Sequence, residues 1–286
     1  MKNILFQVLL LTMLISGLTA FSFFKRNPKN FRPKVGLELY SLRREFAEDE
    51  DKALKIAQSL GFKDVELAGV PNLKSAEFKK KLDLYGMHAS SITTSMKELK
   101  ESPQTIIERA KIFGAEYVVI AWIDHKNDLI TLEEIKEAVL VFNEGGKKLK
   151  ENGLQFCYHI HGYEFAKYEN ETFFDYLYKN TDAEAVKFEE DIFWAKHGGI
   201  DPVEFLKKYG KRTPIMHIKV MAKDVVGTKT GKEKVEADVA WGTGQIDIKA
   251  VILQAQKSGV KHFYLEDESP DVLKQIPISL KFAEGI

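Results

Sequence analysis

The stretch from Leu132 to Ile160, LEEIKEAVLVFNEGGKKLKENGLQFCYHI, contains the pattern that repeats along this chain. Apolar residues recur at helical spacing over 132–151, which predicts an amphipathic helix. Gly153 stands where a helix ordinarily ends, and the short apolar run Leu154–Ile160 predicts a buried strand. The stretch therefore encodes one helix followed by one strand.

The same alternation runs along the rest of the chain. Short apolar runs that predict strands occupy Val35–Tyr40, Asp64–Ala68, His88–Ile92, Tyr117–Trp122, Leu154–Ile160, Ala185–Glu189, Ile215–Lys219 and His262–Leu265. Segments with helical spacing follow them at 51–60, 74–85, 103–113, 132–151, 171–179, 201–209, 247–258 and 271–284. Eight strand–helix units over about 250 residues predict an α/β fold, a single-domain (β/α)8 TIM barrel over 34–286. An open doubly wound sheet is the alternative, but no Gly-x-Gly-x-x-Gly follows the first strand.

Composition excludes several classes of protein. The 286 residues are 44% hydrophobic and 29% charged, which is typical of a globular protein. The 42 basic residues balance the 42 acidic ones, so charge does not favour nucleic acid as a partner. Cys157 is the single cysteine, which excludes an intramolecular disulfide and a Cys-rich zinc or iron–sulfur site.

The N-terminus differs from the rest of the chain. Residues 1–20 combine Lys2, an apolar run and small residues near Ala20, which predicts a signal peptide and an exported protein, periplasmic or secreted. Because the uncharged stretch continues to Phe24, a membrane anchor over residues 4–24 is the alternative. Residues 21–33 contain two prolines and several basic residues and are expected to form a linker.

Polar residues gather where the last four strands of the predicted barrel end. Glu164, Asp191 and His217 are spaced 27 and 26 residues apart, one strand–helix unit each, and Glu266 ends the eighth strand. Four consecutive strands can therefore direct three carboxylates and one imidazole at one point, a ligand set that suits Mn²⁺, Mg²⁺, Co²⁺ or Zn²⁺. Each residue also has a structural explanation: Asp191 as a helix cap, His217 as a buried histidine, and Glu266 as part of an acidic loop.

Other side chains are expected to contact a substrate. His159 and His161 alternate on one strand and so face the same side, as do His217 and Lys219. Charged residues within apolar strands must be paired or functional, and tryptophans at strand ends can form an apolar wall for a sugar ring. The candidate substrate-binding residues are His161, His159, Lys219, Glu66, Trp122, Trp194 and Glu38.

Several motifs occur in a fixed order along the chain. They are GLELYSLR at 36–43, VELAG at 65–69, YHIHGYE at 158–164, FEED at 188–191 with Trp194, GGIDP at 198–202, HIK at 217–219, WGTGQID at 241–247 and YLE at 264–266. This ordered set resembles the xylose isomerase-like TIM-barrel family, the sugar phosphate isomerase/epimerase group, over essentially all of 34–286.

The resemblance implies one divalent metal ion held by Glu164, Asp191, His217 and Glu266. In the epimerases of the family the two glutamates also exchange protons with the substrate, so Glu164 and Glu266 are the catalytic candidates. His161 and Lys219 would contact the substrate, and Glu66 and Trp122 would line the pocket. The chain departs from the family at Glu38, Ile160 and Val220, where Gln, Asn and Asp are common; these changes alter the substrate pocket and leave the metal set intact.

The expected activity is isomerisation or epimerisation of a small carbohydrate through proton removal next to a carbonyl, with the charge stabilised by the metal. Loss of a hydroxyl from the neighbouring carbon would give a lyase or dehydratase acting on a keto-sugar or inosose. Export and the lack of a Gly-rich phosphate-binding loop favour an unphosphorylated sugar or keto-glycoside. A non-catalytic, exported sugar-binding barrel is the alternative from another class.

Overall fold

The computed structural model describes residues 34–69, 76–126 and 129–286. The signal peptide predicted at 1–20, the alternative anchor at 4–24 and the linker at 21–33 lie outside these residues. Among the residues described, none of the helices has the length and apolar character needed to cross a membrane.

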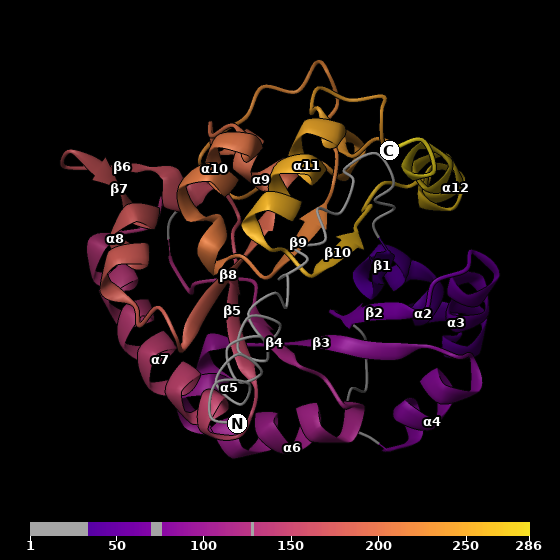
Figure 1. The fold of residues 1–286 in the computed structure, drawn as a ribbon, viewed down its shortest axis with the longest axis horizontal. Helices are drawn as coiled ribbons and strands as arrows, with labels where there is room; N and C mark the ends of the chain where they lie inside the picture. The colour runs from indigo at the N-terminus through magenta and orange to yellow at the C-terminus, as the bar shows by residue number, and fades with distance from the viewer. Residues whose placement is uncertain (1–33, 70–75, 127–128) are drawn as a thin grey trace, which may run out of the picture. The chain divides into compact units, whose positions relative to one another are not determined.

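Eight parallel strands close into a barrel in the order β1-β10-β9-β8-β5-β4-β3-β2, which confirms the predicted TIM barrel (Figure 1). The strands are β1 (Val35–Glu38), β2 (Asp64–Leu67), β3 (His88–Thr94), β4 (Tyr117–Ile120), β5 (Gln155–His159), β8 (Val186–Asp191), β9 (Ile215–Ile218) and β10 (His262–Leu265). Their register places Asp191 opposite His217 and His217 opposite Tyr264. The carboxyl ends of β8, β9 and β10 therefore meet at one side of the barrel.

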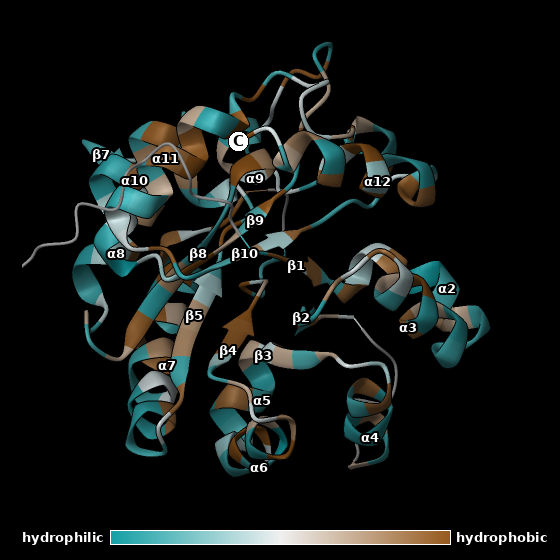
Figure 2. Cartoon of the chain, turned by 45° about the vertical axis from the view of Figure 1, so that its right-hand side comes forward, coloured by the Kyte–Doolittle hydropathy of each residue, from teal (hydrophilic) through white to brown (hydrophobic). Residues whose placement is uncertain are grey.

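Helices cover the outside of the barrel (Figure 1). They are α2 (Arg43–Glu48), α3 (Glu50–Ser59), α4 (Ala76–Leu84), α5 (Met96–Glu101), α6 (Pro103–Phe113), α7 (Leu132–Glu151), α8 (Phe173–Asn180), α9 (Ile192–His197), α10 (Pro202–Tyr209), α11 (Ile248–Ser258) and α12 (Val272–Ala283). Figure 2 shows hydrophilic and hydrophobic residues on the same helices, as expected for helices that pack one side on a sheet.

The long helix α7 shows how the sequence produces this arrangement. Its N-terminus is fixed by a capping box, in which the Thr131 hydroxyl accepts the backbone N–H of Glu134 and the Glu134 carboxylate accepts that of Thr131. Apolar residues such as Ile135, Phe142 and Leu149 are buried, in agreement with the helical spacing read from the sequence.

Several short elements were not predicted. The helices α2, α5 and α9 have six residues each, which is too short for a clear apolar period. A hairpin of β6 (Lys167–Tyr168) and β7 (Glu171–Thr172) precedes α8, so the helix predicted at 171–179 begins at Phe173. Short 3₁₀ turns complete the list: η2 (Leu39–Leu42), η3 (Tyr163–Phe165), η4 (Gly210–Arg212) and η5 (Val235–Ala237).

The interior of the barrel is divided between apolar and charged side chains. Tyr117, Val119, Cys157, Ile215 and Tyr264 form a buried apolar cluster. Buried charged residues lie at or near the carboxyl ends of the strands: Glu38, Glu66, Glu189, Asp191, His159, His217, Lys219 and Glu266. Burial of so many charges is costly unless they are paired or functional, so this end of the barrel is where a site is expected.

Candidate active site

A pocket of about 560 Å³ opens where the strands end. Side chains from opposite sides of the barrel line it, including Glu38 of β1, Glu66 of β2, His159 of β5 and His217 of β9, with Glu266 directly after β10. Active sites of TIM barrels lie at this end of the strands. The pocket is therefore the candidate active site.

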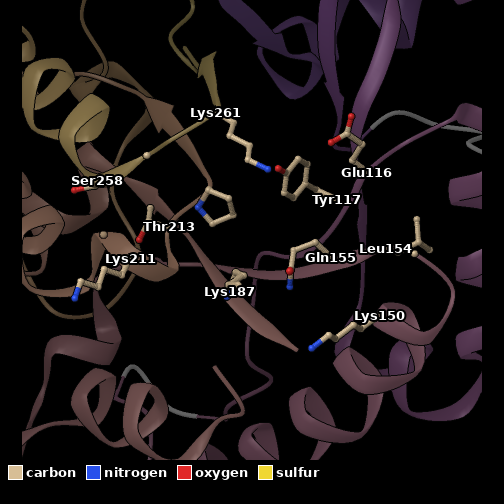
Figure 3. A pocket seen from close by; sticks show the side chains of 14 residues that line it. Glu116, Tyr117, Lys150, Leu154, Gln155, Lys187, Lys211, Thr213, Ser258 and Lys261 are labelled. Carbon is tan, nitrogen blue, oxygen red and sulfur yellow. The ribbon is translucent and has the colours of Figure 1, made fainter. Parts of the chain in front are cut away.

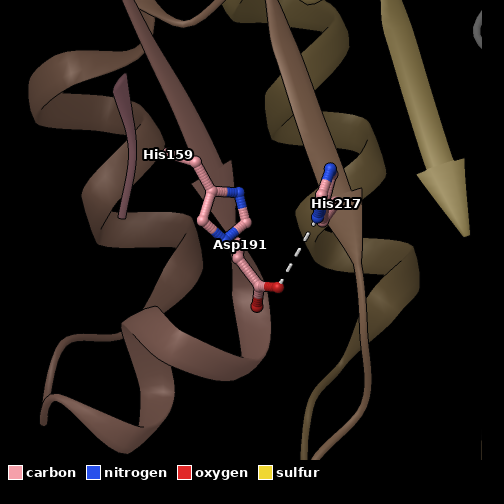
Figure 4. A group of neighbouring side chains, drawn as sticks. All are labelled: His159, Asp191 and His217. Atoms are coloured by element: carbon pink, nitrogen blue, oxygen red, sulfur yellow. Dashed lines mark ion pairs between the residues drawn. The ribbon is translucent and has the colours of Figure 1, made fainter. Parts of the chain in front are cut away.

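Three side chains in and beside this pocket form a candidate metal site. His159, Asp191 and His217 each offer one ligand atom, and these atoms all lie within 4.8 Å of one another (Figure 4). The Oδ1 atom of Asp191 accepts the backbone N–H of Trp194 at 2.9 Å and so caps α9. Its Oδ2 atom is buried, has no hydrogen bond within the described part of the chain and lies 3.9 Å from Nδ1 of His217. Asp191 thus serves as a helix cap and still keeps one oxygen for a ligand.

Carboxylates lie on both sides of the His217 imidazole. Its Nδ1 atom is 2.6 Å from Oε2 of Glu266, and its Nε2 atom is 2.9 Å from Oε1 of Glu66. Burial opposes a charge on this ring, but the nearby carboxylates of Glu189 and Glu66 raise the pKa of His217 well above its ordinary value. A positively charged imidazole balances these acids.

Lys219 carries the second positive charge at this end of the barrel. Its ammonium donates to Glu266 at 2.9 Å and to Glu268 at 2.5 Å, and it lies over the ring of Trp194 at 5.2 Å. Although Lys219 is buried, the carboxylates of Asp238, Glu266 and Glu268 raise its pKa well above the ordinary value. The side chain is therefore a cationic hydrogen-bond donor beside Glu266.

Glu164 lies with a different set of partners from the other predicted ligands. It belongs to η3, which follows Gly162 in a left-handed conformation (φ 88°). The Tyr158 hydroxyl and the backbone N–H of His161 donate to its carboxylate, and burial raises the pKa of Glu164 to about 7. Of the four predicted ligands, the structure brings Asp191, His217 and Glu266 together, and His159 joins them.

Aromatic rings form one wall of the pocket. The His161 ring lies 5.3 Å from the ring of Trp122 and 5.2 Å from that of Trp194. Its Nδ1 atom is buried and has no hydrogen bond among the described residues. Burial, together with the charges of His159 and Lys219, lowers the pKa of His161 well below its ordinary value, so the ring is neutral.

The loop that follows β9 contributes another wall. Gly231, Lys232 and Glu233 line the pocket. The loop is held in place by His197 of α9, whose Nε2 atom lies 3.1 Å from the Glu233 carboxylate. Its Gly231 is in a left-handed conformation (φ 66°), and a Cβ atom there would lie 2.6 Å from the Tyr163 ring. The loop therefore approaches η3 at a point where only glycine fits.

Sequence analysis did not assign a role to Glu189. This carboxylate is fully buried, lines the pocket and lies 3.1 Å from Nδ1 of His159 and 3.3 Å from Nε2 of His217. The sequence could have indicated Glu189 as a site residue through its position two residues before Asp191, because alternate residues of a strand share one face. Glu38 also lines the pocket, and its Oε2 atom is buried without a hydrogen bond among the described residues.

A second pocket, of about 600 Å³, lies at the opposite end of the barrel (Figure 3). Tyr117 and Gln155, the first residues of β4 and β5, line it together with four lysines: Lys150, Lys187, Lys211 and Lys261. None of the predicted site residues borders it. It is of similar size but lacks the imidazole and carboxylate cluster of the first pocket.

The donor set at the first pocket fits a divalent cation. Two imidazoles and the carboxylates of Asp191 and Glu266 are ligands that Mn²⁺, Co²⁺ and Zn²⁺ accept readily, and Mg²⁺ accepts the oxygens. The free Oδ2 atom of Asp191 is the strongest sign, because a buried carboxylate oxygen without a partner is costly.

The sequence matches a known family over most of its length. A family profile described as xylose isomerase-like TIM barrel matches residues 54–285. The chain belongs to the xylose isomerase-like TIM-barrel family, as its motifs predicted.

Similarity to individual proteins is more distant. The chain is 27% identical over 157 residues to an inosose dehydratase of Clostridium tetani (strain Massachusetts / E88), a match that covers 52% of each protein. The chain thus spans about half the length of this curated relative.

Solved structures share the fold. A sugar phosphate isomerase/epimerase from Parabacteroides distasonis ATCC 8503 superposes with a TM-score of 0.72 at 22% identity, covering 88% of this chain and 94% of that one. A xylose isomerase-like TIM-barrel protein from Mycobacterium smegmatis, in complex with magnesium, gives a TM-score of 0.66 at 19% identity and covers 87% and 94%.

Proposed function

We propose that this protein is a divalent-metal-dependent sugar isomerase or epimerase. The observation that carries the proposal is the unpartnered Oδ2 atom of Asp191, which lies among two imidazoles beside an open pocket. His159, Asp191, His217 and Glu266 would hold one ion, Mn²⁺, Co²⁺, Mg²⁺ or Zn²⁺. Such an ion polarises a substrate carbonyl and stabilises the negative charge that develops on its oxygen.

The protein's own residues would handle the proton. Epimerisation requires that a proton leave one face of a carbon and return to the other. The groups that line the pocket, His161 and Glu266 among them, would exchange this proton with the substrate. The Glu266 carboxylate lies on the far side of β8 and β9 from β5, and can exchange a proton from another direction.

Lys219 would hold the carboxylates that face the substrate. Its ammonium donates to Glu266 and Glu268, which line the pocket although Lys219 itself does not. Trp122 and Trp194 on either side of His161 offer apolar surface to the C–H face of a sugar ring.

The charge of the pocket favours a substrate without phosphate. Seven carboxylates line it: Glu38, Glu66, Asp124, Glu189, Glu233, Glu266 and Glu268. Among the lining residues that the structure describes, Lys232 is the one lysine or arginine. A phosphate monoester would be repelled there, whereas neutral hydroxyls find many acceptors. We propose an unphosphorylated sugar or keto-glycoside, encountered outside the cytoplasm if residues 1–20 direct export.

A lyase or dehydratase is the second candidate, and the position of Glu164 favours it. The carboxylate of Glu164 accepts from Tyr158 and His161, and Glu266, but not Glu164, is among the residues that line the pocket. Elimination needs one base and one acid. A base of the pocket would take the C–H proton and a protonated group would give a proton to the departing hydroxyl, so that water and a carbon–carbon double bond would form.

The test is exchange of solvent deuterium into unphosphorylated aldoses, ketoses and keto-inositols, followed by proton NMR. Metal-stripped protein is compared with protein reloaded with Mn²⁺, Co²⁺, Mg²⁺ or Zn²⁺. Exchange that needs the metal and yields an epimer or isomer supports the proposal, and an unsaturated product supports the lyase. Binding without exchange indicates a sugar-binding barrel. Equal turnover of phosphorylated sugars would refute the substrate assignment. Glu137→Gln, an exposed residue of α7, is the control and should exchange like the wild type.

A further inference from the structure

We infer that Glu189 is a positioning residue that orients both candidate ligand histidines, His159 and His217. The inference rests on the metal site proposed above and deepens it. Glu189 lies on β8, two residues before Asp191, and its side chain is fully buried. Its two carboxylate oxygens face different imidazoles, whose ring centroids are 4.6 Å apart.

The contact with His159 selects one tautomer of this ring. Oε2 of Glu189 lies 3.1 Å from Nδ1 of His159 at hydrogen-bond geometry. An ionised carboxylate only accepts, so Nδ1 must carry the proton. The remaining nitrogen of His159, Nε2, is then without a proton, and Figure 4 shows that nitrogen directed toward Asp191.

The contact with His217 brings Glu189 beside a second ring. Oε1 of Glu189 lies 3.3 Å from Nε2 of His217, and Glu66 accepts from the same nitrogen at 2.9 Å. Nδ1 of His217 lies 2.6 Å from Glu266 and 3.9 Å from Asp191, so both nitrogens face carboxylates, and a proton kept on Nε2 would leave Nδ1 for an ion. Glu189 thus fixes the His159 ring by a hydrogen bond and lies beside the His217 nitrogen that is not directed toward Asp191.

The strand geometry explains why one carboxylate serves both rings. Residues two apart on a strand share a face, so β8 presents Asp191 toward the mouth of the pocket and Glu189 one step deeper. Ligand histidines usually donate their second N–H to a carboxylate, which fixes the ring and raises its basicity. Here Glu189 does this for His159, while Glu66 does it for His217 and Glu189 lies 3.3 Å from the same nitrogen.

The same atoms allow a competing arrangement. Glu66, Glu189 and His217 also have ligand atoms within 4.8 Å of one another, so Glu189 would instead be a ligand of a second, inner cation. The number of ions bound per chain separates the two arrangements. One ion per chain is expected if Glu189 orients the histidines, and two are expected if Glu189 is a ligand of an inner cation.

The experiment is a titration of metal-stripped protein with Co²⁺ and Zn²⁺ against a chromophoric chelator, for the wild type, Glu189→Gln and Glu190→Gln. Glu190 is the matched control, since it is the next residue of β8, is equally buried and points to the other face. We expect one ion per chain throughout, affinity lowered about 10- to 100-fold in Glu189→Gln, a changed visible spectrum of its Co²⁺ form, and wild-type affinity in Glu190→Gln.

The inference is overturned if Glu189→Gln binds the ion with the affinity of the wild type. It is also overturned if the wild type binds two ions per chain and Glu189→Gln binds one. Histidine ¹⁵N NMR of the metal-free wild type gives a second test that needs neither variant nor ion. The inference requires a proton on Nδ1 of His159, and a proton on Nε2 alone would contradict it. If the wild type binds no ion, the proposed function fails, whereas the NMR result still decides the role of Glu189.

Discussion

Asp175 links three elements through one carboxylate. Lys208 and Tyr209 of α10 donate to its Oδ1 at 2.6 and 2.8 Å, while Thr172 donates to Oδ2 from the N-cap of α8. Burial opposes ionisation, but these hydrogen bonds lower the pKa of Asp175 to about 2. Because the unfolded value is about 3.9, the stabilisation is complete above pH 4 and is lost as the pH falls toward 2.

We therefore expect Asp175→Asn to lower the free energy of unfolding at neutral pH by about 1 kcal/mol, a figure reduced for solvent screening. Urea unfolding between pH 2 and pH 7 checks this, because the variant should lack that part of the acid-induced loss. Asp83→Asn, which removes an exposed partner of Lys79, should follow the wild type. If the free energy of unfolding depends on pH in the same way for the wild type and Asp175→Asn, the low pKa of Asp175 does not stabilise the fold.

Single residues also show what the sequence could and could not predict. The spacing of Asp191, His217 and Glu266 predicted that they meet, because each ends a parallel strand of the barrel. The same spacing included Glu164, whose carboxylate accepts from the Tyr158 hydroxyl and the backbone N–H of His161 beside the left-handed turn at Gly162, and its role as a ligand stays a prediction. Such a turn depends on local packing, which residue spacing does not report. His159 was predicted to face the pocket as a substrate contact, and its place beside Asp191 emerged from the structure.

At the scale of elements, α7 packs closely against its neighbours through two glycines. A Cβ atom on Gly146 would lie 2.8 Å from the backbone oxygen of Ala185, which precedes β8. Alanine is favoured over glycine within a helix by about 1 kcal/mol, but overpacking against backbone costs about 1–3 kcal/mol. We expect Gly146→Ala to be destabilising by about 1 kcal/mol, measured by chemical denaturation. Lys147→Ala on the exposed side of α7 is the control, and a gain in stability for Gly146→Ala would contradict the packing.

Arg212 of η4 joins the end of α8 to the start of β8. Its buried guanidinium donates to the backbone oxygens of Tyr178 and Val186 and to the Thr181 hydroxyl. A lysine cannot reproduce this fork of donors, so Arg212→Lys should leave buried acceptors unpaired and cost about 2–3 kcal/mol of stability. Thermal or urea unfolding measures the loss. The exposed Arg44→Lys should have almost no effect, and equal effects of the two substitutions would refute the role of Arg212.

Elements differed in how well the sequence predicted them. All eight barrel strands were located, because each is a short apolar run preceded or followed by a longer periodic segment. The helices α2, α5 and α9 were missed since six residues hold less than two turns. The β6–β7 hairpin was missed because two-residue strands carry no alternation.

For the whole molecule, the concentration of carboxylates at one end of the barrel makes stability depend on cations. An ion that binds the folded state alone stabilises it by about 2.7 kcal/mol at a free concentration one hundred times its Kd. The melting temperature of the wild type should therefore rise with added Mn²⁺, Co²⁺ or Zn²⁺. Asp191→Asn should not respond, since it keeps the cap on α9 and loses the charge of the ligand oxygen. If the melting temperature of Asp191→Asn rises as much as that of the wild type, the ion binds at another site.

The most direct test of the account is the number of divalent ions that each purified chain binds, measured by elemental analysis after reloading. Asp201→Asn is the matched control, because Asp201 caps α10 as Asp191 caps α9 but belongs to neither candidate metal group. We expect one ion per chain in the wild type and in Asp201→Asn, and none in Asp191→Asn. A wild type that binds no ion, or an Asp191→Asn that binds one as tightly, would contradict it.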